Sequence, residues 1–254
     1  MSQRAIAAAQ HVLAKLRITD PSQIQIEEIA YLENVLTTEK EISGSEGRLV
    51  SRNGKAILTV KANLHAARRR FVIAHEVGHH VLHSEMGLNL CESADFIGYH
   101  KTRPQESEAN VFASEILMPS FLWKSDTING EPSWHVVENY ASYFSTSFTA
   151  TCIKYINMFK SPVTLICSEN GKIKWFFPNV SCRYFHKNIG ESISPESLAN
   201  KQTQKAFERF AKEIVLPRTW FSDYNLSDDQ YFYESCYYSE RYRQTLSLVW
   251  PMNF

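Results

Sequence analysis

Between residues 69 and 83 the polar and apolar positions recur with the period of an α-helix. Four histidines and one glutamate share an arc of roughly 140° on a helical wheel, and small or aliphatic residues occupy the opposite side. The polar set is His75, Glu76, His79, His80 and His83, and the apolar set is Ala74, Val77, Gly78, Val81 and Leu82. The pattern predicts a half-buried amphipathic helix from about Arg69 to His83. Gly78 costs about 1 kcal/mol relative to alanine inside a helix, which indicates that another backbone packs close to it.

Four more segments have helical patterns, and one segment predicts a β-hairpin. The helical segments are residues 2–16, 25–31, 104–117 and 121–158. The third is bounded by prolines, because Pro104 suits the first position of a helix and Pro119 cannot continue one. The hairpin is expected at residues 47–60, where two strand-like runs flank Asn53-Gly54, a pair that favours a tight turn.

A change of pattern at Ser161-Pro162 predicts two domains, residues 1–160 and residues 161–254. In the second, strands are expected at residues 163–168 and 172–177, around the turn residues 169–171, and again within residues 230–250. A helix is expected at residues 195–212. The predicted fold class is therefore α+β: a larger domain of helices and a small antiparallel sheet, followed by a smaller α+β domain. The smaller domain could gate the larger one as a sensor, but the sequence identifies no signal.

Composition excludes several function classes. The 27 basic and 27 acidic residues give a formal net charge of zero, which argues against a non-specific nucleic-acid binder. Arg68-Arg69-Arg70 is a local exception that we expect to be solvated or paired internally. No apolar run reaches the 18 or so residues of a membrane span. The five cysteines are odd in number and form no Cys-x-x-Cys pair, which favours reduced thiols in a cytoplasmic protein.

Two histidines in the first helix have the spacing of metal ligands. His75 and His79 lie one turn apart, about 6 Å along the axis, so their imidazoles can converge on one ion. Zinc accepts imidazole nitrogen, and catalytic zinc sites use three protein ligands and keep one position for water. Glu76 lies about 100° around the helix from His75, where it can accept a proton from a water molecule that the cation acidifies. We expect Zn²⁺ here, with Mn²⁺ as an alternative.

The best candidate for the third ligand is Glu106, in the helix that opens at Pro104. It lies at the end of a helix face whose other residues are mostly small or apolar, so its carboxylate is expected to be buried. A buried carboxylate needs a cation or a hydrogen-bond partner. Asn110 follows one turn later and could orient an imidazole. In the alternative interpretation, Glu106 is a solvated acid that the helix dipole favours. Weaker candidate ligands are His65, Cys91, Glu92 and His100.

Three stretches together resemble the ImmA/IrrE family of metallo-endopeptidases. They are residues 70–79, 106–110 and 113–119, and the resemblance extends over roughly residues 5 to 158. It implies a zincin-like domain in which His75, His79 and Glu106 bind zinc and Glu76 is the catalytic base. It also implies that the substrate is a helix-turn-helix repressor of a stress or mobile-element response. This chain has no clear helix-turn-helix of its own, so the repressor would be a separate protein.

Two other functions stay open at this point. The protein could be a zincin that acts on other peptides, or a regulator that uses the metal site to hold a partner without catalysis. The presence of Glu76 argues against the regulator, because this glutamate can act as a base next to the ion. A purely structural zinc site would normally be closed by a fourth protein ligand instead. The side chain that stabilises the oxyanion is not assigned, and Tyr99, His100 and His80 are candidates by chemistry only. Neither nucleic acid nor a membrane is an expected partner.

Overall fold

A computed structural model describes residues 2–83, 88–91, 103–204, 210–222, 226–227 and 229–253 of the chain, without the side chains of residues 88–91 and 202–204. The chain divides into two compact units. The first comprises Met1–Lys124 and Glu138–Thr151, and the second comprises Ser125–Val137 and Cys152–Phe254. The predicted boundary at Ser161-Pro162 stays a prediction. Both units combine helices with a sheet, so the predicted α+β class is confirmed.

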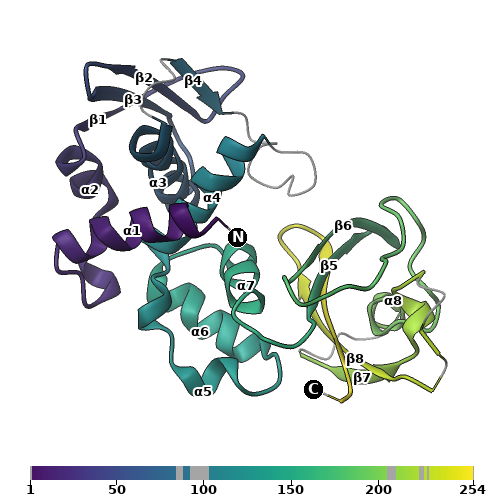
Figure 1. Ribbon diagram of the computed structural model, residues 1–254. Helices are drawn as coiled ribbons and strands as arrows, with labels where there is room; N and C mark the ends of the chain where they lie inside the picture. Colours follow the sequence, from purple (N-terminus) through teal and green to yellow (C-terminus); the bar gives the residue numbers. More distant parts are fainter. Residues whose placement is uncertain are drawn as a thin grey trace. The chain divides into compact units, whose positions relative to one another are not determined.

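The first unit consists of helices packed on one four-stranded sheet (Figure 1). The helices are α1 (Gln3–Lys15), α2 (Ile26–Leu32), α3 (Ala66–His83) and α4 (Pro104–Leu117), and the strands are β1 (Val35–Lys40), β2 (Gly47–Arg52), β3 (Lys55–Lys61) and β4 (Leu88–Cys91). The strand order is β1-β3-β2-β4. The prediction of an antiparallel sheet was wrong for β1, which pairs with β3 in parallel, so the sheet is mixed. Helix α3 packs on β1, β2 and β3, and α4 packs on α3.

Local sequence explains the elements that were predicted. Ser2 caps α1 by accepting a hydrogen bond from the backbone N–H of Ala5 at 3.4 Å, as an N-cap serine does. The β2–β3 hairpin is confirmed: Asn53 and Gly54 have φ angles of 51° and 71°, the left-handed conformation that a two-residue turn needs. Pro104 occupies the first turn of α4, which ends at Leu117 as predicted.

Helix α3 is more deeply buried than its pattern indicates. It begins at Ala66 rather than at Arg69, and every residue from Val72 to His80 is buried. The prediction of a half-buried helix was wrong, because the polar arc faces other elements of the protein instead of solvent. The prediction for Gly78 is confirmed: a Cβ atom there would lie 3.3 Å from the Cα atom of Ala109 in α4.

Residues 121–158 form three helices instead of one continuous run. They are α5 (Ser125–Ile128), α6 (Trp134–Phe144) and α7 (Phe148–Ile156). Ser145, with a φ of 53°, separates the last two. Both α6 and α7 contain residues of each unit.

The second unit contains a five-stranded antiparallel sheet in the order β6-β5-β9-β8-β7. The strands are β5 (Thr164–Glu169), β6 (Lys172–Pro178), β7 (Lys212–Val215), β8 (Phe232–Ser239) and β9 (Gln244–Pro251), and helix α8 (Leu198–Gln204) packs on the last three of them. The hairpin around residues 169–171 and the strands within residues 230–250 are confirmed. The helix predicted at residues 195–212 was wrong at both ends, since α8 is shorter and Lys212 opens a strand.

A buried carboxylate fixes α8 on this sheet. Glu234 of β8 has no exposed surface, and it accepts hydrogen bonds from the backbone N–H groups of Leu198 at 2.9 Å and Ala199 at 3.0 Å. These groups belong to the first turn of α8, where N–H groups lack partners within the helix. Burial raises the pKa of Glu234, and the hydrogen bonds to the carboxylate oppose that rise.

Four cysteines whose side chains are described, Cys152, Cys167, Cys182 and Cys236, are free and buried. Burial raises the pKa of each of them, to about 12 for Cys167. Such thiols are protonated and unreactive at neutral pH. Among the described helices, none has both the length and the apolar character that a membrane span requires.

Candidate metal centre

Helices α3 and α4 bring the three predicted ligand side chains together. The Nε2 atoms of His75 and His79 lie 3.0 Å apart, and Glu106 Oε2 lies 3.2 Å from the first and 3.3 Å from the second. The two imidazoles are 0% and 1% exposed, and the Glu106 side chain is 16% exposed. Glu106 is therefore a largely buried carboxylate beside two imidazoles, which differs from the solvated acid of the alternative interpretation.

The spacing of these atoms fits a small cation with tetrahedral coordination. Ligand bonds of about 2.0 to 2.2 Å at tetrahedral angles place neighbouring donor atoms about 3.4 Å apart. The three observed separations, 3.0 to 3.3 Å, are close to that value. Two imidazole nitrogens and one carboxylate oxygen are also a donor set of catalytic zinc sites. In the part of the chain that the structure describes, this is the one group of three such side chains that converges in this way.

Asn110 contacts the outer side of one of these imidazoles. Its Oδ1 atom lies 2.9 Å from Nδ1 of His75, one helical turn beyond Glu106 in α4. An amide oxygen only accepts hydrogen bonds, so Nδ1 of His75 carries the proton and its Nε2 presents a lone pair to the centre. The contact gives Asn110 the geometry of a residue that orients a metal ligand.

Glu106 is anionic at neutral pH. Burial raises the pKa of its carboxyl, but the hydrogen bonds and charge interactions with His75 and His79 outweigh burial, so the pKa lies well below its ordinary value. The anionic form is the one that binds a cation.

Glu76 is fully buried in α3, beside the first histidine, and β2 leaves room for its carboxylate. The room is provided by Gly47: a Cβ atom on Gly47 would lie 2.7 Å from Oε1 of Glu76 and 3.0 Å from Cγ1 of Val72. We did not predict a role for Gly47 from the sequence, because its importance depends on the packing of β2 over α3. No pattern of neighbouring residues in the sequence indicates that packing.

The other two histidines of α3 contact different partners. Nδ1 of His80 lies 3.4 Å from the hydroxyl oxygen of Ser51, in β2. Nε2 of His83 lies 3.4 Å from Oε2 of Glu108, whose other carboxylate oxygen accepts a hydrogen bond from the Ser2 hydroxyl at 2.8 Å. Neither imidazole belongs to the converging group.

Of the weaker candidate ligands from the sequence, only His65 has a described side chain, and it does not belong to the converging group. His65 is exposed and precedes α3. Glu92, Tyr99 and His100 lie outside the described residues, as does the side chain of Cys91. The oxyanion donor is therefore still unassigned.

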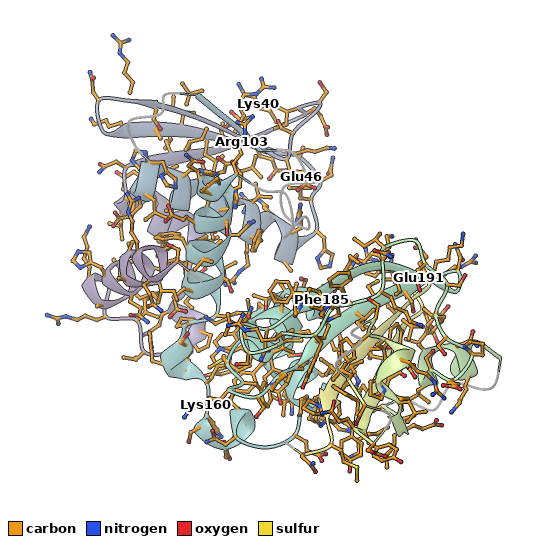
Figure 2. All side chains as sticks on the ribbon, turned by 45° about the vertical axis from the view of Figure 1, so that its right-hand side comes forward. Lys40, Glu46, Arg103, Lys160, Phe185 and Glu191 are labelled. Atoms are coloured by element: carbon orange, nitrogen blue, oxygen red, sulfur yellow. The ribbon has the colours of Figure 1, made fainter. Side chains whose placement is uncertain are left out.

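The arginine run at the start of α3 is mainly paired within the protein, as predicted. Arg68 forms an ion pair with Glu46, which precedes β2 (Figure 2). Arg69 pairs with Glu27 and with Glu39, the latter at 3.3 Å. These contacts connect α3 to α2 and to the sheet, and so support the helix that carries His75 and His79.

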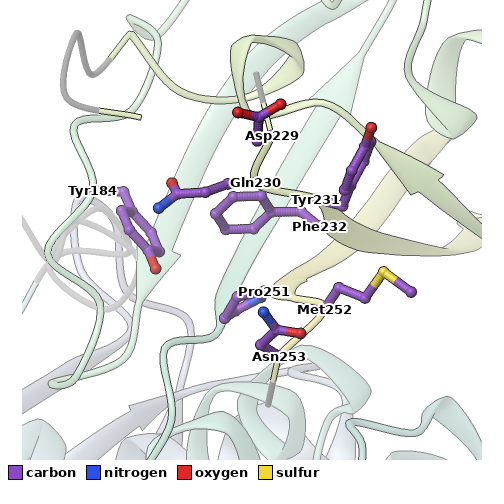
Figure 3. A pocket seen from close by; sticks show the side chains of 8 residues that line it. All are labelled: Tyr184, Asp229, Gln230, Tyr231, Phe232, Pro251, Met252 and Asn253. Carbon is purple, nitrogen blue, oxygen red and sulfur yellow. The ribbon is translucent and has the colours of Figure 1, made fainter. Parts of the chain in front are cut away.

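A separate pocket of about 190 Å³ lies in the second unit (Figure 3). It is lined by Tyr184, Phe232 and residues 229–231 and 251–253, none of which was a predicted site residue. Its volume is below the range of roughly 300 to 1,000 Å³ typical of sites for drug-sized ligands. It offers one carboxylate, that of Asp229, and no histidine or cysteine, so it does not resemble a second metal centre.

Comparisons with known proteins agree with the fold, and the family match covers the part of the chain that carries this site. Residues 33–155 match a protein family described as the IrrE N-terminal-like domain, Peptidase M78. The fold is similar to the solved structure of a Mycobacterium tuberculosis transcriptional regulator, with a TM-score of 0.64 and 11% sequence identity over 99% of this chain and 78% of that chain. At that identity the likeness concerns the fold alone. No curated protein matches the sequence.

Proposed function

Because residues 33–155 belong to the family of IrrE N-terminal-like domains, we propose that this protein is a zinc-dependent endopeptidase that cleaves a separately encoded helix-turn-helix repressor. The family match confirms the resemblance found in the sequence and supports a metallopeptidase-type domain. The observation that carries the proposal is the convergence of His75, His79 and Glu106, whose ligand atoms lie within 3.3 Å of one another. Cleavage of the repressor would relieve repression of its genes.

In this proposal His75, His79 and Glu106 hold the ion, and a zinc ion there supplies a Lewis acid that polarises the peptide carbonyl. Glu76 accepts a proton from the attacking water and then donates it to the nitrogen of the leaving group. Asn110 keeps His75 in the tautomer that presents Nε2, because its Oδ1 accepts a hydrogen bond from the Nδ1–H group of His75, with an N···O distance of 2.9 Å.

Two features favour catalysis over a purely structural or partner-holding metal site. The described residues supply three ligands, which leaves one tetrahedral corner for water or substrate, whereas structural zinc sites are closed by four protein ligands. In addition, Glu76, which follows His75 in the same helix, is 0% exposed, although burying a carboxylate is costly. A site that only held a partner would not need that carboxylate.

The repressor as substrate is the finer part of the proposal and rests on the resemblance to ImmA/IrrE proteins. The similar solved structure is a transcriptional regulator, which is compatible with a role in gene control. The main competing function is a zincin that acts on short peptides in general. Manganese could replace zinc in the cell, because both ions accept nitrogen and oxygen ligands.

The test is cleavage of a repressor whose gene lies beside that of this protein. Glu76→Gln should keep the fold and the bound zinc but lose cleavage, because an amide cannot accept the proton. His83→Gln is the matched control, since it changes a largely buried polar residue of the same helix outside the centre. Undiminished cleavage by Glu76→Gln would eliminate Glu76 as the base, and equally rapid hydrolysis of unrelated peptides would favour the general peptidase.

A further inference from the structure

The face of the first sheet that is turned away from α3 carries an exposed row of aliphatic side chains. Leu36 of β1, Ile57 of β3 and Val50 of β2 are 57%, 54% and 49% exposed. Leu36 is in register with Ile57, and Ile57 is in register with Val50, so the three are direct neighbours across the strands. The residues that alternate with them point inward and are buried: Val35, Leu49, Ala56 and Leu58. Aliphatic side chains gathered in this way on an outer face often mark an interaction site.

The same face is strongly basic. Residues on one face of a strand alternate, so the outward positions of β1, β2 and β3 follow from the exposed row. They contain five cationic residues, two threonines and no Asp or Glu; the cations are Lys40, Arg48, Arg52, Lys55 and Lys61. Lys40 stands at the end of β1 in Figure 2. Among the described residues none of these five forms an ion pair, although the formal charge of the whole chain is zero.

We propose that this outer sheet face, defined by the aliphatic row and the five cations, binds an amphipathic helix of a partner protein whose apolar stripe is flanked by acidic residues. Neighbouring strands lie about 4.8 Å apart, which sets the spacing of the aliphatic row. Side chains three and four residues apart on a helix are about 5 to 6 Å apart. A helix that crosses the strands along the row can therefore match its apolar stripe to the three aliphatic side chains.

The cations lie on both sides of the row, where such a helix presents its polar flanks. Arg52 and Lys55 are paired in register on one side. Arg48 lies on the other side, in register with Thr59. Acidic residues on both flanks of the helix would meet these side chains, and charge complementarity of this kind fixes orientation and accelerates association.

Two other occupants fit the face less well. Nucleic acid is held mainly by phosphate contacts, which would use the cations but leave the central aliphatic row unused. A second copy of the chain, packed face to face, would place five cations against five cations. An acidic amphipathic helix uses both the aliphatic row and the cations.

The proposed interaction is separate from the peptidase chemistry. The outer face lies on the opposite side of the sheet from Gly47, whose α-carbon faces Glu76. Variants of the outer face should therefore leave zinc content and substrate cleavage at their native levels. Failure of the proposed peptidase function would not affect this inference, and failure of this inference would not affect the peptidase.

The probe is a synthetic peptide, stapled in the helical state, with leucines along one stripe and glutamates on both flanks. Its binding to the full chain is measured by fluorescence anisotropy at low and at high salt. We expect saturable binding that weakens with salt, and about tenfold weaker binding to Ile57→Glu. Ile214→Glu is the matched control, because Ile214 is a strand residue with a similar exposure of 52% in the second unit.

Two charge-reversal variants complete the test. Lys55→Glu should weaken binding, and Lys160→Glu, an exposed lysine in the second unit (Figure 2), should not. Ile57→Thr, which keeps a β-branched residue, serves if the glutamate variant fails to fold, and it should also weaken binding. The proposal is overturned if the peptide does not bind, if Ile57→Glu and Ile214→Glu bind it equally well, or if duplex DNA binds to the same face more tightly than the peptide.

Discussion

Gly78 lies where α3 and α4 meet, and its replacement by alanine tests whether this contact sets the geometry of the metal centre. A Cβ atom at Gly78 would lie 3.0 Å from Cδ1 and 3.2 Å from Cβ of Phe112, and 3.3 Å from Cα of Ala109. Alanine is favoured over glycine by about 1 kcal/mol in a helix interior, whereas overpacking a core typically costs about 1 to 3 kcal/mol. One of the contacts is backbone, so α4 must shift.

We therefore expect Gly78→Ala to lower the free energy of unfolding by up to about 2 kcal/mol, since overpacking outweighs helix propensity. Because α4 carries Glu106, the affinity for zinc should fall by roughly tenfold or more. Urea unfolding measures the first effect, and competition with a chromogenic chelator measures the second.

Gly130→Ala is the control for this substitution, because a Cβ atom at Gly130 would approach no atom closer than 3.9 Å. It should leave zinc affinity unchanged. A Gly78→Ala protein that is more stable than the native protein, and that binds zinc equally tightly, would show that α3 and α4 do not need their close approach.

Three further predictions follow from buried contacts. Asn110→Ala should weaken zinc binding by about 10- to 100-fold in chelator competition, because the Nδ1–H group of His75 loses its hydrogen-bond acceptor. A zinc affinity equal to that of the native protein would show that Asn110 does not orient His75. Gly47→Ala should keep zinc but lose repressor cleavage, because the added methyl group would lie 2.7 Å from the Glu76 carboxylate; a native cleavage rate would refute the need for that space. Burial raises the pKa of Glu234 above its usual 4.5, so the stabilising contribution of its neutral form is complete below pH 4.5 and is lost as pH rises through the raised pKa. Urea unfolding over this range should show that loss for the native protein, and a Glu234→Gln protein with the same pH dependence would contradict it.

The convergence of His75, His79 and Glu106 could be predicted because its signals are local. The spacing of His75 and His79 is one helical turn, and Pro104 fixes the start of the helix on which Glu106 and Asn110 share a face. Each helix could thus be oriented from its own residues. The close packing of α3 on α4 is also indicated in the sequence, because Gly78 is a small residue inside a helix, where glycine is less favourable than alanine.

Features that depend on pairing between distant segments could not be predicted in the same way. Strand β1 was not recognised, because it contains Thr37, Thr38 and Glu39 and gains its stability from parallel pairing with β3. The pattern of α3 predicts a half-buried helix, but packing of both α4 and β2 on its polar arc buries every residue from Val72 to His80. At Lys212 the helix-like pattern was overridden, because residues 212–215 pair with β8.

The most direct test of the central claim is the metal content of the purified full chain, measured by inductively coupled plasma mass spectrometry. We predict about one zinc per chain for the native protein, and loss of that zinc in His79→Ala and Glu106→Gln. His83→Ala, one turn further along the same helix, should retain it. Zinc at native stoichiometry in His79→Ala or in Glu106→Gln would contradict the assignment of His75, His79 and Glu106 as the metal centre.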